Sequence, residues 1–123
     1  MESSARWLFA ASAAMFLGSV ALTVRAQNQT VRVAQFDNPA VKVWRTTIMP
    51  KAPLTLHRHD HARVIVALAG GTIKVAPQKG ASEMHVWETG KAYWLTADPP
   101  GQLHTDEVIG DKPMEVMVVE LQK

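Results

Sequence analysis

The chain has 123 residues, no cysteine and a formal net charge of +2 at neutral pH. Without cysteine there are no disulfides and no thiolate ligands, so any bound metal must be held by histidine and carboxylate groups. The basic residues are few and do not form a run, whereas nucleic-acid binding relies on clustered positive charge. We therefore expect no nucleic-acid partner.

Residues 1–26 have the pattern of a secretory signal peptide. A short polar start precedes the apolar segment 7–24, and small residues follow at a plausible cleavage site before Gln27. We expect cleavage there and export to a periplasm or to the outside of the cell. An uncleaved membrane anchor is the alternative, because the apolar segment is close to the shortest length that spans a bilayer. Residues 27–123 are then one domain.

The part of the chain after the signal shows no helical pattern and is typical of an all-β domain. Short β-like runs alternate with turn residues, and we expect about nine strands. Their predicted ranges are 31–36, 41–48, 54–59, 63–69, 72–76, 83–88, 91–95, 104–109 and 114–121. Gly70 and Gly71 stand between two of these runs and predict a hairpin. Strands with short connections predict a sandwich or barrel, in which inward side chains converge.

Three histidines suggest where this protein acts. His57 and His59 are two residues apart, a spacing that places both side chains on one face of a strand. His104 follows a rigid proline-glycine segment much later in the chain and is predicted to converge on the same spot. Neutral imidazole is the commonest side-chain metal ligand, and three such ligands leave positions open for water or substrate. We therefore expect a metal site.

The histidines and their surroundings resemble the two motifs of the cupin family. The matching residues are His57, His59 and Gly70 in the first motif and Pro99, Gly101 and His104 in the second. The resemblance spans roughly residues 41–120. It implies a small double-stranded β-helix, or jelly-roll barrel, with the three histidines at the metal position of an internal pocket. It also implies a homodimer, because small cupins often pair. The family contains dioxygenases, isomerases and non-catalytic binders, so the fold does not name a function.

One departure from the first motif bears on the chemistry. Arg63 stands where the family has a glutamate, and a guanidinium cannot ligate a metal. Three interpretations follow. Three neutral histidines bind the metal while Arg63 turns to a carboxylate or to the substrate. Alternatively, His61 or Asp106 completes the ligand set. In the third, the metal site is lost and the pocket binds a small anion or a sugar through Arg63 and the histidines.

The surroundings of the site give further expectations. A buried arginine needs a counter-charge, and bound substrate or one of the acidic residues Asp106, Glu115 and Glu120 would supply it to Arg63. His85 has no motif partner and is expected on an exposed strand surface. The large aromatic residues are expected mainly in core or cross-strand packing. They are Trp44, Trp87, Tyr93 and Trp94.

These observations lead to one expected function and one alternative. The first is an exported cupin-like protein that binds Fe, Mn, Ni or Zn, with small-molecule dioxygenation or isomerisation as the expected chemistry. All four metals accept imidazole ligands, so the histidines do not choose between them. The alternative is a metal-free barrel that binds a small anionic or sugar ligand without turnover.

Overall fold

The computed structural model describes residues 29–123 and contains eight β-strands in that range. The strands are β1 Val31–Asp37, β2 Val41–Ile48, β3 Arg63–Ala69, β4 Gly71–Pro77, β5 Glu83–Trp87, β6 Ala92–Leu95, β7 His104–Ile109 and β8 Met114–Leu121. The predicted all-β class is confirmed. Within these residues there is no helix long and apolar enough to cross a membrane. The predicted signal peptide, residues 1–26, lies outside the described range, so cleavage and export stay predictions.

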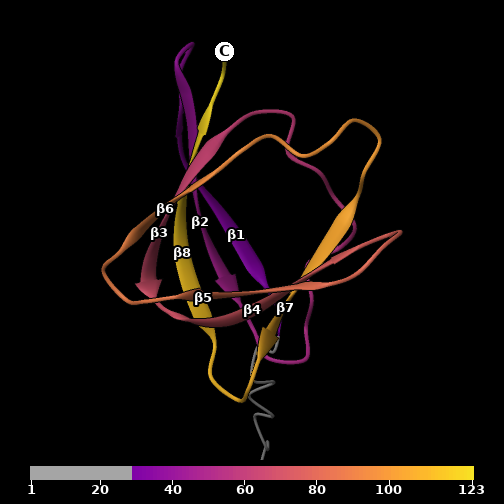
Figure 1. The fold of residues 1–123 in the computed structure, drawn as a ribbon. Helices are drawn as coiled ribbons and strands as arrows, with labels where there is room; N and C mark the ends of the chain where they lie inside the picture. Colours follow the sequence, from indigo (N-terminus) through magenta and orange to yellow (C-terminus); the bar gives the residue numbers. More distant parts are fainter. Residues whose placement is uncertain (1–28) are drawn as a thin grey trace, which may run out of the picture.

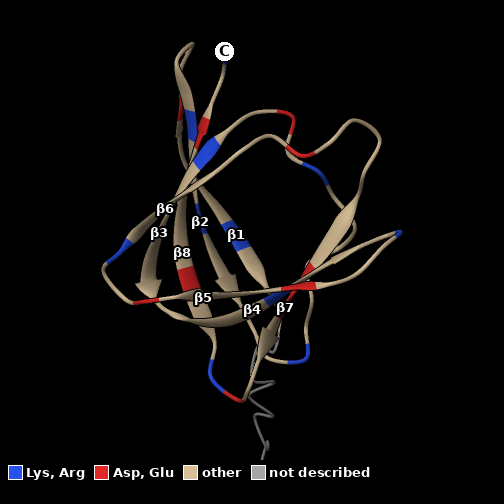
Figure 2. Ribbon diagram, in the orientation of Figure 1, with Lys and Arg blue, Asp and Glu red and all other residues tan. Residues whose placement is uncertain are grey.

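The strands form two antiparallel sheets that face each other around a common interior (Figure 1). The first sheet has five strands in the order β1-β2-β8-β3-β6, and the second has three in the order β5-β4-β7. Strands that are neighbours in a sheet are therefore mostly distant in sequence, as in a jelly roll. Figure 2 shows acidic and basic residues interspersed over both sheets and the connecting loops.

The predicted strand at residues 54–59 is wrong. This segment makes only one isolated bridge, in which the backbones of His57 and His104 exchange hydrogen bonds of 3.0 and 2.9 Å. Two further backbone bonds hold it, from the Leu54 N–H to the carbonyl of Asp106 at 2.9 Å and from the Asp98 N–H to the carbonyl of His59 at 2.8 Å. Pro53 has no N–H to donate, and the chain bends again at Asp60, so a continuous ladder does not form. The segment is a loop that is fastened to the start of β7.

The predicted hairpin at Gly70 and Gly71 is also wrong. β3 pairs with β6 and β8, whereas β4 pairs with β5 and β7, so the two glycines carry the chain from one sheet to the other. A Cβ atom at Gly70 would overlap the carbonyl oxygen of Trp87 and lie 2.7 Å from the amide nitrogen of Thr89. Glycine is needed here because another part of the backbone passes too close for any side chain.

The core lies between the sheets and is built by alternating side chains. On β8, which lies between β2 and β3, Met114, Val116 and Val118 are at most 5% exposed and the residues between them are more accessible. Ile73 on β4 approaches from the opposite sheet and is 1% exposed. Each such side chain contributes about 1.5–3 kcal/mol when it is fully buried. This packing fixes the strand ends that carry the polar site.

Candidate metal centre

Two pairs of hydrogen bonds join the loop of residues 54–59 to Asp98 and His104. The first is the reciprocal backbone pair between His57 and His104, the first residue of β7. In the second, the backbone N–H of His59 donates to Oδ2 of Asp98 at 2.6 Å, and the N–H of Asp98 donates to the carbonyl of His59 at 2.8 Å. Asp98 directly precedes a turn closed by the 3.1 Å bond from the Gln102 N–H to the Pro99 carbonyl. These contacts, and not strand pairing over residues 54–59, hold His57 and His59 near His104.

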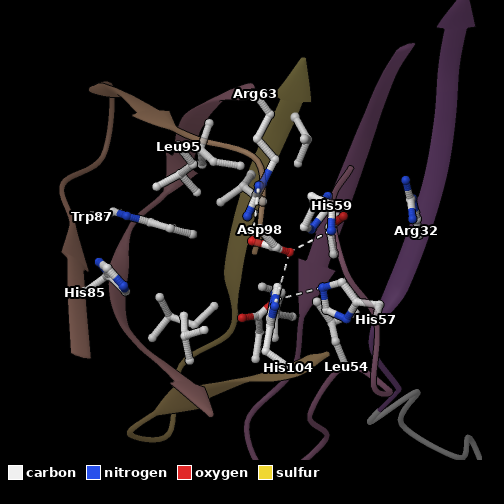
Figure 3. A pocket seen from close by; sticks show the side chains of 18 of the residues that line it. Arg32, Leu54, His57, His59, Arg63, His85, Trp87, Leu95, Asp98 and His104 are labelled. Carbon is white, nitrogen blue, oxygen red and sulfur yellow. Dashed lines mark hydrogen bonds and ion pairs between the residues drawn. The ribbon is translucent and has the colours of Figure 1, made fainter. Parts of the chain in front are cut away.

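The three predicted histidines lie together. One ring nitrogen each from His57, His59 and His104 lies within 4.8 Å of the other two. The ring centroids of His57 and His104 are 4.5 Å apart, and those of His57 and His59 are 5.1 Å apart. Figure 3 shows the three rings gathered on one side of the pocket. His104 is 6% exposed, and the other two are half-buried. The cluster is therefore compact enough for one ion.

Each histidine has an acceptor beside its Nδ1 atom. His57 Nδ1 lies 2.7 Å from the carbonyl oxygen of Thr55, and His59 Nδ1 lies 2.9 Å from Oε2 of Glu120. His104 Nδ1 is 3.4 Å from Oδ2 of Asp98. In a neutral ring only one nitrogen carries a proton, and these neighbours favour the proton on Nδ1. The Nε2 lone pairs are then available for a metal, which is the usual outer-shell arrangement of metal-bound histidine.

Asp106 sits at the open side of two of the rings. Its Oδ2 atom lies 3.3 Å from Nε2 of His57 and 3.7 Å from Nε2 of His104. With the Nδ1 proton of His57 directed at Thr55, a neutral ring would set an Nε2 lone pair against a carboxylate oxygen. A proton or a metal ion between the two atoms removes this repulsion. Consistent with this, the hydrogen bond to Asp106 raises the pKa of His57.

Burial acts in the opposite direction on the other two rings. It lowers the pKa of His104 and the pKa of His59, because a charged imidazolium is poorly solvated in the barrel. Glu120 partly opposes this effect at His59 through its hydrogen bond. His59 and His104 are therefore held in the neutral form that metal ligation requires.

Arg63 is buried and engaged by other groups of the chain. It is 7% exposed, its Nη1 donates to the carbonyl of Thr96 at 3.2 Å, and the same atom lies 3.9 Å from Oδ1 of Asp98. Burial lowers the pKa of Arg63, and Asp98 is the strongest of the carboxylates that raise it. Asp98 was not among the predicted counter-charges of Arg63. Of the acidic residues that were predicted, Glu115 is instead paired with Arg45 at 3.7 Å.

The carboxylates restore the negative charge that the first motif lacks. Asp98, Asp106 and Glu120 each contact a histidine of the cluster, and Arg63 is the cation among them. With these four groups charged, two negative charges remain beside the three rings in the neutral form that ligates a metal. That balance matches one divalent cation. By ligand type, spacing and charge, the residues present fit a first-row metal.

The cluster forms one wall of a cavity of about 590 Å³ to which every described strand contributes. This volume lies in the range of small-molecule sites. Trp44 and Trp87 line the cavity and also belong to the buried core, as expected of packing aromatics. His85 is half-buried and lines the cavity beside Trp87, so its predicted exposed position is wrong (Figure 3). His61 lies outside both the cluster and the lining.

Comparison with known proteins supports the fold and leaves the function open. No protein-family model matches the chain, and no curated protein matches its sequence. Solved structures do match. A cupin domain from Bordetella pertussis Tohama I has a TM-score of 0.68 at 22% identity, covering 77% of this chain and 95% of that one.

Two further structures extend the likeness. An RmlC-like cupin with a double-stranded β-helix fold from Methanocaldococcus jannaschii has a TM-score of 0.59 at 12% identity, covering 79% of this chain and 84% of that one. An RmlC-like cupin from Desulfovibrio desulfuricans has a TM-score of 0.56 at 16% identity and covers 92% and 98% of the two chains. The chain therefore has the double-stranded β-helix fold of the cupins, as the resemblance implied.

Proposed function

We propose that this protein binds one divalent first-row metal through His57, His59 and His104 and acts on a small molecule in the adjoining cavity. The observation that carries the proposal is the set of three acceptors beside the three Nδ1 atoms. Thr55, Glu120 and Asp98 lie beside the three Nδ1 atoms and favour ligation through Nε2, and one ring nitrogen of each histidine lies within 4.8 Å of those of the other two.

The residues around the proposed metal position would have different roles. A bound Fe, Mn, Ni or Zn ion would supply a Lewis-acidic centre with open positions, and iron would also support oxygenation of a coordinated small molecule. Asp106 is placed to serve as a fourth ligand or to hold a proton near the open positions. Asp98 positions the His59 backbone and the His104 ring. Apolar side chains such as Ile73 limit water in the cavity.

The contacts of Arg63 weigh against the metal-free alternative. An anion-binding site centred on Arg63 needs free donors directed at the ligand. Arg63 does line the cavity, but its Nη1 donates to Thr96, the same atom lies 3.9 Å from Asp98, and the residue is almost fully buried. We infer that Arg63 balances the charge of Asp98 and does not anchor the ligand.

Metal analysis of the purified protein tests the proposal. We expect stoichiometric first-row metal by elemental mass spectrometry, and its loss in the double variant His57→Ala/His104→Ala. His61→Ala is the matched control, because His61 belongs to the same loop but lies outside the cluster. Absence of metal after reloading with Fe(II), Mn(II), Ni(II) and Zn(II), or an equal loss in His61→Ala, would overturn metal binding.

A second measurement tests the chemistry separately. We expect the iron-loaded protein to consume oxygen with an enolate, catechol or thiol substrate, and the double variant to be inactive. Oxygen uptake is followed with an electrode at fixed protein concentration. If the metal is stoichiometric and none of the three substrate types supports uptake, oxygenation is withdrawn while metal binding stands.

A further inference from the structure

A second arginine, Arg32, reaches the cavity from the edge strand β1. All seven residues of β1 are exposed, yet Arg32 is among the residues that line the cavity. Its guanidinium carbon lies 3.7 Å from the ring centroid of Trp44, within the range of a cation–π interaction. Trp44 is 4% exposed and lines the same cavity. An aromatic face therefore holds the Arg32 guanidinium at the cavity.

Within the described part of the chain, no acidic side chain pairs with Arg32. Among residues 29–123, no carboxylate lies within 4.0 Å of its guanidinium nitrogens. Burial lowers the pKa of Arg32, and Glu120 raises it from a greater distance. The nearer contact of Glu120 is with His59. Arg32 thus differs from Arg63, because no hydrogen bond or ion pair within residues 29–123 engages its guanidinium, whereas Nη1 of Arg63 is engaged by Thr96 and Asp98.

Trp44 links Arg32 to the histidine cluster. The ring of Trp44 is parallel to that of His59, with 4° between their planes and 6.3 Å between their centroids. Guanidinium, indole and imidazole thus follow one another along one side of the cavity, and Figure 3 shows Arg32 beyond His59. A carboxylate bound at Arg32 would leave the rest of its molecule along the apolar lining of the cavity, with its far end toward the cluster.

We propose that Arg32 anchors the carboxylate of a small ligand whose aromatic or apolar body fills the cavity. A guanidinium binds a carboxylate through two parallel hydrogen bonds, which gives orientation as well as affinity. The part of this inference that directs the ligand toward a metal rests on the proposed function. The carboxylate contact depends only on Arg32, Trp44 and the cavity. Arg32 therefore sets specificity for the ligand's charge.

Calorimetric titration with a defined series of probes tests this inference. The probes are benzoate, phenylacetate, 3-phenylpropanoate and 4-phenylbutanoate, each beside its neutral amide. We expect the tightest carboxylate to bind at least about tenfold more weakly to Arg32→Gln, the size of effect that a lost charged hydrogen bond gives. Its amide should bind wild-type protein at least about tenfold more weakly than the acid does. Arg32→Lys should fall between Arg32→Gln and wild type, because it keeps charge without the two-pronged geometry.

A control arginine and a parallel metal measurement separate the possible failures. Arg45→Gln is the control, because Arg45 is exposed, contacts Glu115 and does not line the cavity. Wild-type affinity in Arg32→Gln, equal losses in both variants, or no binding of any carboxylate would overturn the inference. Metal content is measured on every variant. Arg32-dependent binding in a protein that takes up no metal would remove the proposed function and leave the Arg32 site standing.

Discussion

Replacing Glu120 by glutamine tests the outer shell of the proposed metal centre. Oε2 of Glu120 lies 2.9 Å from Nδ1 of His59, and the Glu120 side chain is 16% exposed. Glutamine keeps the size of the side chain and a carbonyl acceptor but removes the negative charge. We expect Glu120→Gln to fold and to bind metal more weakly, because the carboxylate both fixes the His59 tautomer and makes the ring a stronger ligand.

The expected loss of affinity follows from the contacts of Glu120. Outer-shell partners of metal-bound histidine typically contribute about 10- to 100-fold in metal affinity. That range corresponds to about 1.4–2.8 kcal/mol of binding free energy. The charge balance points the same way. Asp98, Asp106 and Glu120 outnumber Arg63 by two charges, and the substitution removes one of them from a partly buried site where screening by salt is incomplete.

Competition with a chromophoric chelator for Zn(II) measures this effect directly. Glu115→Gln is the matched control, because it removes a carboxylate from the same strand, β8, at a residue paired with the exposed Arg45. We expect its metal affinity to stay within about twofold of wild type, as for a surface charge away from the site. Unchanged affinity in Glu120→Gln, or an equal loss in Glu115→Gln, would refute the outer-shell reasoning.

Three further predictions concern the fold and the charges of the site. Gly70→Ala should lower the free energy of unfolding by more than about 2 kcal/mol in urea titrations, because the new Cβ meets backbone atoms; unchanged stability would contradict the proposed sheet crossing. Arg63→Met should cost about 3 kcal/mol, because it leaves Asp98 without its nearest cation; a stability gain would show that the pair is not needed. In metal-free protein, NMR should show His57 taking up its proton at higher pH than His104, since a neighbouring carboxylate raises the pKa of His57 and burial lowers that of His104. Metal affinity should then fall as acidification protonates His57, and the opposite titration order would contradict the assigned contacts.

The sequence predicted the histidine cluster correctly for a partly wrong reason. The two-residue spacing of His57 and His59 predicts a strand, but the structure has a loop there. What holds the loop is a set of contacts with residues far along the chain, including His104 and Asp98. The motif therefore predicts that the three rings lie together. The local alternation of residues does not show whether the backbone that carries them is a strand or a loop.

Gly70 shows that local sequence patterns do not determine strand pairing either. Two glycines between β-like runs favour a hairpin when only neighbouring residues are considered. Whether the next strand returns beside the first or crosses to another sheet depends on packing with Trp87 and Thr89, which lie further along the chain. Eight of the nine expected strands occur in residues 29–123 at about the expected bounds, but their partners could not be predicted, because pairing is decided by long-range contacts.

Only some of the carboxylates near the cluster could be predicted from the sequence. Asp106 could be named because it shares a strand with His104 at a spacing of two residues. Asp98 precedes the turn that leads to His104, and that position was the one local signal that it lies near the site. Glu120 was named only as a counter-charge for Arg63, and the cross-strand register does place the two residues opposite each other. Its contact with His59 depends on where the loop lies against β8, which strand patterns do not report.

The positions of these carboxylates change the interpretation of Arg63. In the motif the arginine replaces a ligand and so argues against a metal. In the structure its guanidinium lies beside Asp98, while Asp106 faces His57 and Glu120 faces His59. A fourth carboxylate at position 63 would add repulsion to a site that already carries an excess of negative charge. The arginine is therefore compatible with a divalent cation, because the negative charge lost at one motif position is supplied from three other elements of the barrel.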